Sequence, residues 1–452
     1  MAAKHPGIAG KWASGSGPGN SKEDMMRLTR RHFMAGAAAS TALPYLTGPA
    51  FAQAKDLNVF AHRVMENVST GSAGGDVTAA FEAEHGANIA WATFETGPLH
   101  DRLFREASLG ESSVDVAFIL NTYATPRIAT LFEALDDYQA RDPIENIDDI
   151  FPGLIDGVTF DGKLVAVPFR HASTGLHYNE EILAERGFSA PPKTIEEFIE
   201  VAKACTYTRE DGTPVVGYIL PGVAYPEVIA FARAWDADFI NSNFEVVANS
   251  DAMITALKAI RELYDAGAVP RNLVGMKAED ANTWMQTGRA AMTMSSMSRN
   301  GLYNDPEKSQ VAGKIKTTTF PVAEALLGKY EVAPAKVEFW SMAIPKNSQN
   351  KELAWQFIKW MSSPEVTLAA ALNGNGPVRN STYDDPRIIE RLPYAQDERR
   401  VLNVARVPLP AFDEAARAAD YFKEEAEAVV LGMKTPEQAM EDLVARVTPL
   451  LG

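Results

Sequence analysis

Catalysis by side chains requires a nucleophile with a base, converging carboxylates or a cluster of metal ligands. The sequence contains no G-x-S-x-G, P-loop or H-E-x-x-H motif. His171 and His177 could share one face of a strand, but no Cys, Asp or Glu at ligand spacing accompanies them. The sequence therefore predicts no metal site, and His171 with Glu95 is the only acid–base pair that we can nominate for an enzyme.

Polar side chains at strand ends point instead to binding. The stretches 57–60, 87–94 and 114–120 read as strands, and helical patterns separate them. This alternation is typical of a parallel sheet covered by helices, in which ligands lie beyond the carboxyl ends of the strands. Glu95 and Asn121 follow two of these strands directly, and Ser296 ends a later one. We expect all three side chains to face a ligand cleft.

Local signals place further elements along the chain. Asp161 and Gly162 form a turn dipeptide between two alternating runs, which predicts a hairpin. Thr194 with Glu197 three residues later predicts the start of a helix. A polar, glycine-rich loop is expected over 66–75, and the tail from 413 to 451 is mostly helical. The fold class that these elements indicate is α/β.

The N-terminus has the features of an export signal. Arg30 and Arg31 precede the short apolar run 33–46, and an A-x-A cleavage site ends at Ala52. The sequence predicts a twin-arginine signal peptide behind a disordered, Gly/Ser-rich extension, together occupying residues 1–52. We expect the native start at Met25 or Met26, cleavage near Ala52 and export to the periplasm.

Composition limits the partners and the architecture. The 452 residues carry a net charge of −16, which disfavours nucleic acid and anionic lipid surfaces. A chain of this length is expected to form two lobes with sizeable cores. Cys205 is the only cysteine, so no disulfide can form within the chain, and we expect it to be a small buried residue.

Four stretches in a fixed order, and a fifth that follows them, resemble one protein family. They are DGKLVAVPFRHASTGLHYNEEIL, PPKTIEEFIEVAKA, WMQTGRAAMTM, FWSMAIPKNSQNKELAWQFIKWMSSPEV and GNGPVRNSTYDDP. Together they resemble extracellular solute-binding protein family 1 of ABC importers, the maltose-binding-protein-like family, over essentially the whole mature chain. Because each stretch is weak alone, the resemblance rests on their order and spacing.

The resemblance implies a two-lobed periplasmic-binding-protein-like fold of type II, in which the chain crosses between the lobes several times. Carried onto this sequence, lobe 1 is 55–171 plus 343–388, and lobe 2 is 172–337 plus 389–452. A ligand would bind in the cleft and close the lobes by hinge motion. The implied protein is a monomer without a cofactor that delivers a carbohydrate to an ABC permease in the inner membrane.

The resemblance also adds candidate ligand contacts to Glu95, Asn121 and Ser296. Arg170 and His171 enter the first crossing, where a cation would suit an acidic or sulfonated sugar, unless Arg170 forms a salt bridge instead. Trp340 lies at the return crossing, where the family often has a stacking aromatic residue. Trp235 and Arg379 complete the set, although Trp235 replaces small residues and Arg379 could simply brace its loop.

Two alternatives stay open. An exported enzyme acting on glycans would use His171 with Glu95 as acid and base. A receptor for a non-sugar solute such as a polyamine would need several carboxylates in the cleft. The preferred hypothesis is a carbohydrate receptor that performs no chemistry.

Overall fold

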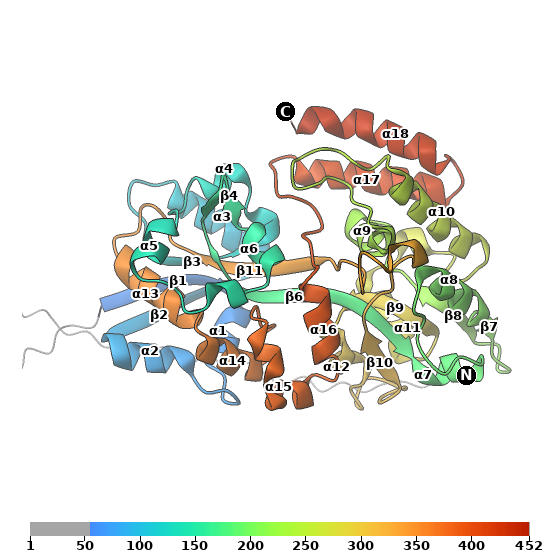
Figure 1. Cartoon of the computed structure of the whole chain (residues 1–452), viewed down its shortest axis with the longest axis horizontal. Helices are drawn as coiled ribbons and strands as arrows, with labels where there is room; N and C mark the ends of the chain where they lie inside the picture. Colours follow the sequence, from blue (N-terminus) through green and yellow to red (C-terminus); the bar gives the residue numbers. More distant parts are fainter. Residues whose placement is uncertain (1–54, 452) are drawn as a thin grey trace, which may run out of the picture. The chain divides into compact units, whose positions relative to one another are not determined.

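A computed structural model describes residues 55–451 of the chain. The predicted signal peptide lies outside the described residues. The described residues belong to one compact unit. Nine of its strands make a sheet in the order β2-β1-β3-β11-β6-β9-β8-β7, with β10 also paired to β6 (Figure 1), and β4 and β5 form a separate two-stranded sheet. The strands are β1 Lys55–His62, β2 Ala87–Phe94, β3 Val116–Leu120, β4 Thr159–Phe160, β5 Lys163–Leu164, β6 Val167–Asn179, β7 Tyr207–Thr208, β8 Pro214–Ile219, β9 Ala290–Ser296, β10 Ile315–Thr318 and β11 Val337–Ala343.

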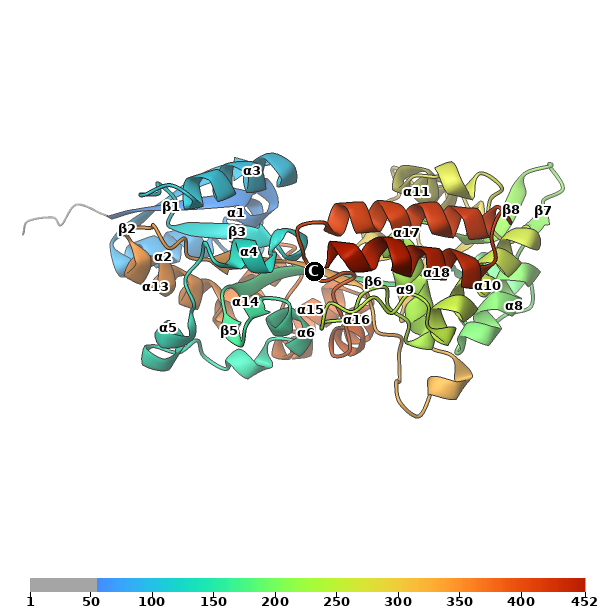
Figure 2. The ribbon, with the colours of Figure 1, turned by 90° about the horizontal axis from the view of Figure 1, so that it is seen from above.

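Helices cover this sheet, and α17 and α18 lie side by side (Figures 1 and 2). None of the helices within residues 55–451 combines the length and apolar composition that a membrane span requires. The helices are α1 Arg63–Ser69, α2 Val77–His85, α3 Thr96–Ala107, α4 Pro126–Ala129, α5 Asp136–Arg141, α6 Pro152–Asp156, α7 Glu180–Glu185, α8 Ile195–Ala204, α9 Tyr225–Ala232, α10 Asp251–Asp265, α11 Ala278–Gln286, α12 Arg299–Tyr303, α13 Lys351–Met361, α14 Pro364–Leu372, α15 Pro386–Arg391, α16 Ala395–Leu402, α17 Ala415–Val430 and α18 Pro436–Val447.

Strand pairing explains how one sheet serves two halves of the molecule. β1 pairs in parallel with β2 and β3, and β8 pairs in parallel with β9. Between these groups runs β6, whose first half pairs with β11 and whose second half pairs with β9 (Figure 1). β6 is therefore the continuous link between the two groups of parallel strands.

The apolar side chains form two main hydrophobic cores. The first core collects buried residues from 57–169 and 337–405, and the second collects them from 176–333 and 409–447. Ala395, Leu402 and Ala405 pack into the first core, whereas the expected lobe limits place them in lobe 2. The chain therefore passes between the cores near β6, near β11 and again just before 409.

Several local expectations are confirmed. Asp161 and Gly162 take φ values of 50° and 73° in the turn between β4 and β5, the left-handed region that such a tight hairpin requires. The Thr194 hydroxyl accepts a hydrogen bond from the Glu197 N–H at 3.2 Å and so caps α8. Cys205 is buried in the second core.

One local expectation is wrong. The loop expected over 66–75 begins only after α1, which occupies Arg63–Ser69. The helix forms because the Nδ1 atom of His62 accepts a hydrogen bond from the Val64 N–H at 3.2 Å, and because Met65 and Val68 are buried on one side of it. Histidine is not among the usual capping residues, so the sequence gives little sign of this helix start.

Candidate functional site

The carboxyl ends of the three parallel strands bring predicted and unpredicted side chains together. Because β2, β1 and β3 are parallel and adjacent, their carboxyl ends share one edge of the sheet. His62 ends β1, and its Nε2 atom lies 3.6 Å from a carboxylate oxygen of Glu95, which follows β2. Arg63 lies 4.0 Å from the same carboxylate. Glu95 is 74% exposed, so its oxygens remain accessible.

Aromatic rings gather around His62, the neighbour of this carboxylate, and around His100. The Trp340 ring lies 5.7 Å from that of His62 and 5.5 Å from that of His100 on α3. The His100 ring in turn stacks on Tyr123, with ring centroids 3.9 Å apart and planes 11° apart. Tyr123 belongs to the short helix Asn121–Tyr123, which directly follows β3. We call His62, Glu95, His100, Tyr123 and Trp340 the strand-end site.

Further charged residues lie on β11, near Trp340, and on α9 of the second core. Glu338, two residues before Trp340 on β11, lies 3.6 Å from Lys336. Burial raises the pKa of Glu227, which is on the first turn of α9, and the nearby Glu338 adds to this effect while Lys336 opposes it. Burial also raises the pKa of Tyr225, with both glutamates contributing. Tyr225 and the single carboxylate of α9, Glu227, therefore lie close enough to Glu338 on β11 to interact electrostatically with it.

Beside β11, the strand β6 also runs between the two cores. Arg170 pairs with Trp340 across the β6–β11 ladder, and its Nη1 donates to the Gly374 oxygen at 3.3 Å and to Asn375 Oδ1 at 3.0 Å. Among residues 55–451 Arg170 forms no direct salt bridge, because both acceptors of its guanidinium are neutral. Arg170 is half-buried, and within the described chain only its Nη1 atom donates a hydrogen bond.

His171 points away from these residues into a buried network. Its Nε2 atom lies 3.1 Å from the Tyr383 hydroxyl, and burial with the neighbouring charge of Arg170 lowers its pKa to about 3. The Tyr383 hydroxyl donates to Glu398 Oε2 at 2.9 Å, and the Ser173 hydroxyl donates to Glu398 Oε1 at 2.8 Å. We call His171, Ser173, Tyr383 and Glu398 the hinge network.

Three other predicted contacts lie elsewhere. Arg379 is fully buried, and its guanidinium donates to the main-chain oxygens of Ser362, Asn146 and Glu145, with Asp149 at 3.5 Å. It therefore braces its loop, which was the alternative left open by the sequence. Trp235 packs against the second core, 5.6 Å from the Phe231 ring. Ser296 pairs with Thr174 of β6, and its hydroxyl bonds that of Ser298 at 2.9 Å.

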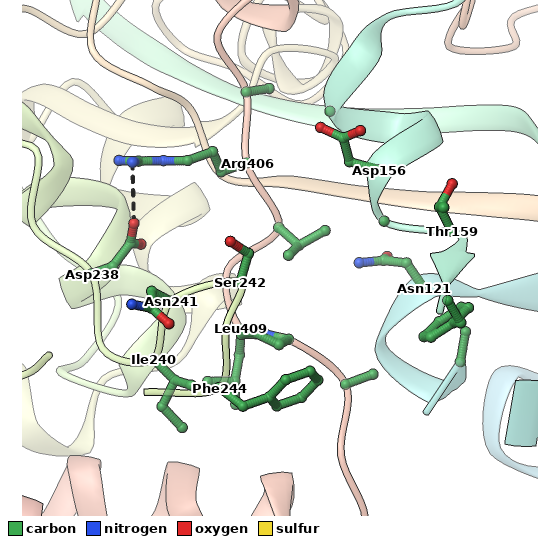
Figure 3. A pocket seen from close by; sticks show the side chains of 18 of the residues that line it. Asn121, Asp156, Thr159, Asp238, Ile240, Asn241, Ser242, Phe244, Arg406 and Leu409 are labelled. Atoms are coloured by element: carbon green, nitrogen blue, oxygen red, sulfur yellow. Dashed lines mark ion pairs between the residues drawn. The ribbon is translucent and has the colours of Figure 1, made fainter. Parts of the chain in front are cut away.

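A cavity of about 350 Å³ lies between segments of the two cores (Figure 3). Its walls come from segments of both cores and include Asn121, Phe160 and Phe244. Three of its charged groups are paired: Asp238 lies 2.8 Å from Arg233 and 3.3 Å from Arg406, and Figure 3 shows the second of these pairs. Asn121 is the only predicted contact on this wall, and its Oδ1 accepts a hydrogen bond from the Phe339 N–H at 2.9 Å.

Sequence reasoning did not single out His62, His100, Tyr123 or Tyr225. Tyr123 lies two residues after the predicted contact Asn121, but nothing in the sequence distinguished it from its neighbours. Within residues 55–451, no three His, Cys, Asp or Glu side chains are placed to hold a metal ion. The strand-end site thus offers aromatic faces and a carboxylate, which are groups suited to binding.

The family profile for bacterial extracellular solute-binding proteins matches residues 76–393. The chain belongs to this family. A solute-binding protein from Sinorhizobium fredii, described as a probable amino-acid ABC transporter periplasmic-binding protein, is 25% identical over 447 residues, which cover 93% of this chain and 97% of that one.

Solved structures of this type share the fold. The sugar-binding protein MalE from Xanthomonas citri matches with a TM-score of 0.74 and 22% identity, covering 88% of this chain and 97% of that one. An ABC transporter solute-binding protein from Agrobacterium radiobacter in complex with ribitol matches with a TM-score of 0.66 and 21% identity, covering 88% and 98%. The two-lobed α/β fold expected from the sequence is confirmed. The family consists of extracellular binding proteins, not enzymes.

Proposed function

We propose that this solute-binding protein captures a carbohydrate or a sugar-like polyol at the strand-end site and delivers it to an ABC permease. The observation that carries the proposal is the series of ring contacts that links Tyr123 through His100 and Trp340 to His62. His62 in turn lies 3.6 Å from the exposed carboxylate of Glu95. An aromatic face packs against the apolar C–H face of a sugar, while carboxylate and imidazole groups bond its hydroxyls. The MalE protein and the ribitol-bound protein, which share this fold, support a polyhydroxylated ligand.

The second half of the molecule would complete the site. Tyr225 and Glu227 at the start of α9 are close enough to Glu338 for its charge to influence both groups. We infer that bending within β6 and β11 moves these residues toward the strand-end site when ligand binds. In this proposal Ala395, Leu402 and Ala405, which pack in the first core, move with that core and not with lobe 2 as the sequence-based limits would have it. The ligand-bound form would be the one that the permease recognises.

A cationic solute is the second candidate. Glu95, Glu227 and Glu338 place three carboxylates along one crossing, and a polyamine or another amine would pair with them. Aromatic rings such as Trp340 would also attract a cation. The relative from Sinorhizobium fredii, whose description names amino acids, adds weight to a ligand that contains nitrogen.

The exported-enzyme alternative has less support. Its acid–base pair would need His171 near Glu95, but His171 is 4% exposed and bonds Tyr383, whereas Glu95 faces His62. We therefore propose that the protein performs no chemistry. We also propose that it acts in the periplasm as a monomer after cleavage near Ala52, without a cofactor.

Thermal unfolding of residues 53–452 against a panel of solutes tests the proposal. The panel holds neutral mono- and disaccharides, polyols, uronic acids, sulfonated sugars and amines. A solute at about 100 times its Kd adds roughly 2.7 kcal/mol to the free energy of unfolding, which raises Tm measurably. A rise with sugars or polyols supports the proposal, and a rise with amines alone supports the second candidate. Turnover of a panel sugar would overturn the assignment as a receptor.

A further inference from the structure

Tyr123 is held in an orientation that its own chain segment does not explain. It is the last residue of a single 3-10 turn after β3, and the adjoining Ala124 leaves helical geometry. A side chain at such a position would normally sample several rotamers. Here the phenol ring is half-buried and lies flat on the His100 imidazole, 3.9 Å away with planes 11° apart. Its orientation is therefore set from outside, by His100.

His100 is itself fixed on both ring nitrogens. Nδ1–H donates to the Thr96 oxygen at 2.7 Å, and Nε2 accepts the Leu120 N–H at 3.1 Å, which defines the tautomer. The side chain is fully buried, and burial lowers its pKa to about 4, so the ring is neutral near pH 7. Because it has no free donor or acceptor, His100 cannot contact a ligand with a polar atom.

The His100 imidazole also contacts Trp340, another aromatic side chain of the strand-end site. Trp340 lies 5.5 Å from His100 with the two ring planes 33° apart. Tyr123 comes from the end of β3 and Trp340 from β11, and His100 on α3 contacts both. One buried ring thus fixes the relative positions of two side chains from separate elements.

We propose that His100 is a positioning residue that holds Tyr123 as a stacking wall for the C–H face of a ring sugar, with Trp340 as the neighbouring wall. This inference rests on the proposed function. A stacked aromatic contact contributes only if the ring already has the correct plane, since ordering it upon binding would cost part of the gain. His100 supplies that order before the ligand arrives.

Two substitutions of His100 distinguish a role in positioning Tyr123 from a role in stabilising the fold. His100→Phe keeps a flat ring beneath Tyr123 but leaves the Leu120 N–H without an acceptor. His100→Gln can keep one of the two hydrogen bonds but offers no flat ring. If His100 acts by positioning, H100F binds maltose like the wild type despite a lower Tm, and H100Q binds about tenfold more weakly. A purely structural role predicts the opposite order, with affinity following Tm.

Variants of Tyr123 and a matched histidine complete the experiment. Tyr123→Ala should weaken maltose binding about tenfold, whereas Tyr123→Phe should bind like the wild type. His85 provides the control, because it stacks on Phe81 at 4.3 Å and 25° in the same core but at the amino end of β2, away from Glu95. His85→Gln should leave the Kd unchanged.

Calorimetry with maltose, and with the sugar that raises Tm most in the panel, decides the outcome. Wild-type binding that H100Q and Y123A leave unchanged would overturn the role of His100 and preserve the proposed function. A wild type that binds no sugar of the panel would overturn both. Weaker binding by H100Q and Y123A, with H100F, Y123F and H85Q near the wild type, would establish the positioning role.

Discussion

The strand-end site and the hinge network contain similar residues, but their glutamates are in opposite states. Each has a histidine, a tyrosine and a glutamate. In the hinge network the side chains of His171, Tyr383 and Glu398 are buried and bond one another at 2.9–3.1 Å. In the strand-end site the Glu95 carboxylate is 74% exposed and lies 3.6 Å from His62, beyond a normal hydrogen bond.

The comparison shows what distinguishes a cluster that binds from one that fixes the chain. The hinge network joins β6 to the segment that holds Tyr383 and Glu398, and both oxygens of that buried carboxylate accept a hydrogen bond from the chain itself. The strand-end site leaves hydrogen-bonding capacity unused beside exposed ring surface. Unused capacity next to aromatic rings is what an incoming polyol requires.

The largest expected effect comes from exchanging the two glutamates for alanine. Glu398→Ala leaves the hydroxyls of Ser173 and Tyr383 buried without an acceptor, which should lower the free energy of unfolding by about 3 kcal/mol. Glu95→Ala should change it by less than about 0.5 kcal/mol, because Glu95 is exposed. Denaturant unfolding measures both. Equal losses in the two variants would contradict the comparison.

The second-largest effect is expected when the pH is lowered, because protonation of the buried histidines should reduce stability. Burial lowers the pKa of His171 to about 3 and that of His100 to about 4, so the folded state takes up their protons later than the unfolded state does. Their contribution is complete above pH 6.5 and is lost as pH falls toward these values. Between pH 7 and 5, the titration of each of these two histidines should lower the free energy of unfolding of the protein by about 2 kcal/mol. His171→Asn should reduce this slope when unfolding is followed at both pH values.

Glu398 should act with the opposite sign. Burial raises its pKa, so its protonation favours the folded state as pH falls from the raised value toward the ordinary 4.5. This gain offsets part of the histidine loss in the wild type. Glu398→Gln removes the gain, so the variant should lose stability more steeply with acid. A slope unchanged from the wild type would show that Glu398 titrates normally.

Trp340→Ala tests the strand-end site, and its expected effect is moderate. Losing the ring should weaken sugar binding about tenfold, the size of one good aromatic contact. Trp284 is the control, because the Arg289 guanidinium covers its ring at 4.0 Å and it packs in a separate hydrophobic cluster. Trp284→Ala should lower Tm but leave the Kd unchanged in titration calorimetry.

The smallest effect is expected from an exposed pair. Arg127 on α4 lies 2.9 Å from Asp413, which precedes α17, and both side chains are largely exposed. Asp413→Asn should lower the free energy of unfolding by less than about 1 kcal/mol, and the difference should vanish in high salt. A larger loss of stability, or one that persists in high salt, would mean that the Arg127–Asp413 pair stabilises the contact between α4 and the start of α17 more than its exposure suggests.

Much of the fold could be predicted because its signals are local. The Asp161–Gly162 hairpin and the Thr194 helix start depend on a few adjacent residues, and both are confirmed. The extent of β6 could not be predicted, since its 13 residues form one strand only through pairing with both β11 and β9. The capping of α1 by His62 was missed because it uses an uncommon capping residue.

The candidate site was predictable in part for the same reason. Glu95 directly follows β2, so a rule about strand ends was sufficient to place it at the strand-end site, whereas Asn121, chosen by the same rule, is buried and bonds the Phe339 N–H. Arg379 shows the limit of this reasoning: two of the three carbonyl groups that it bonds belong to Glu145 and Asn146, which are 234 and 233 residues away in the sequence. The pairing of His100 with Tyr123 likewise depends on how α3 packs on β3, which no local pattern encodes.

The burial of Cys205 has a practical consequence for following this protein in motion. Its thiol is fully enclosed in the second core, and burial raises its pKa to about 11, so it is a poor nucleophile near neutral pH. Leu109 and Leu327 are 54% and 50% exposed and flank elements of the first and second halves. Cysteines introduced at these two positions would accept maleimide dyes while the native thiol stays unlabelled. Energy transfer between the dyes could then report lobe movement in single molecules without removing a residue from the core.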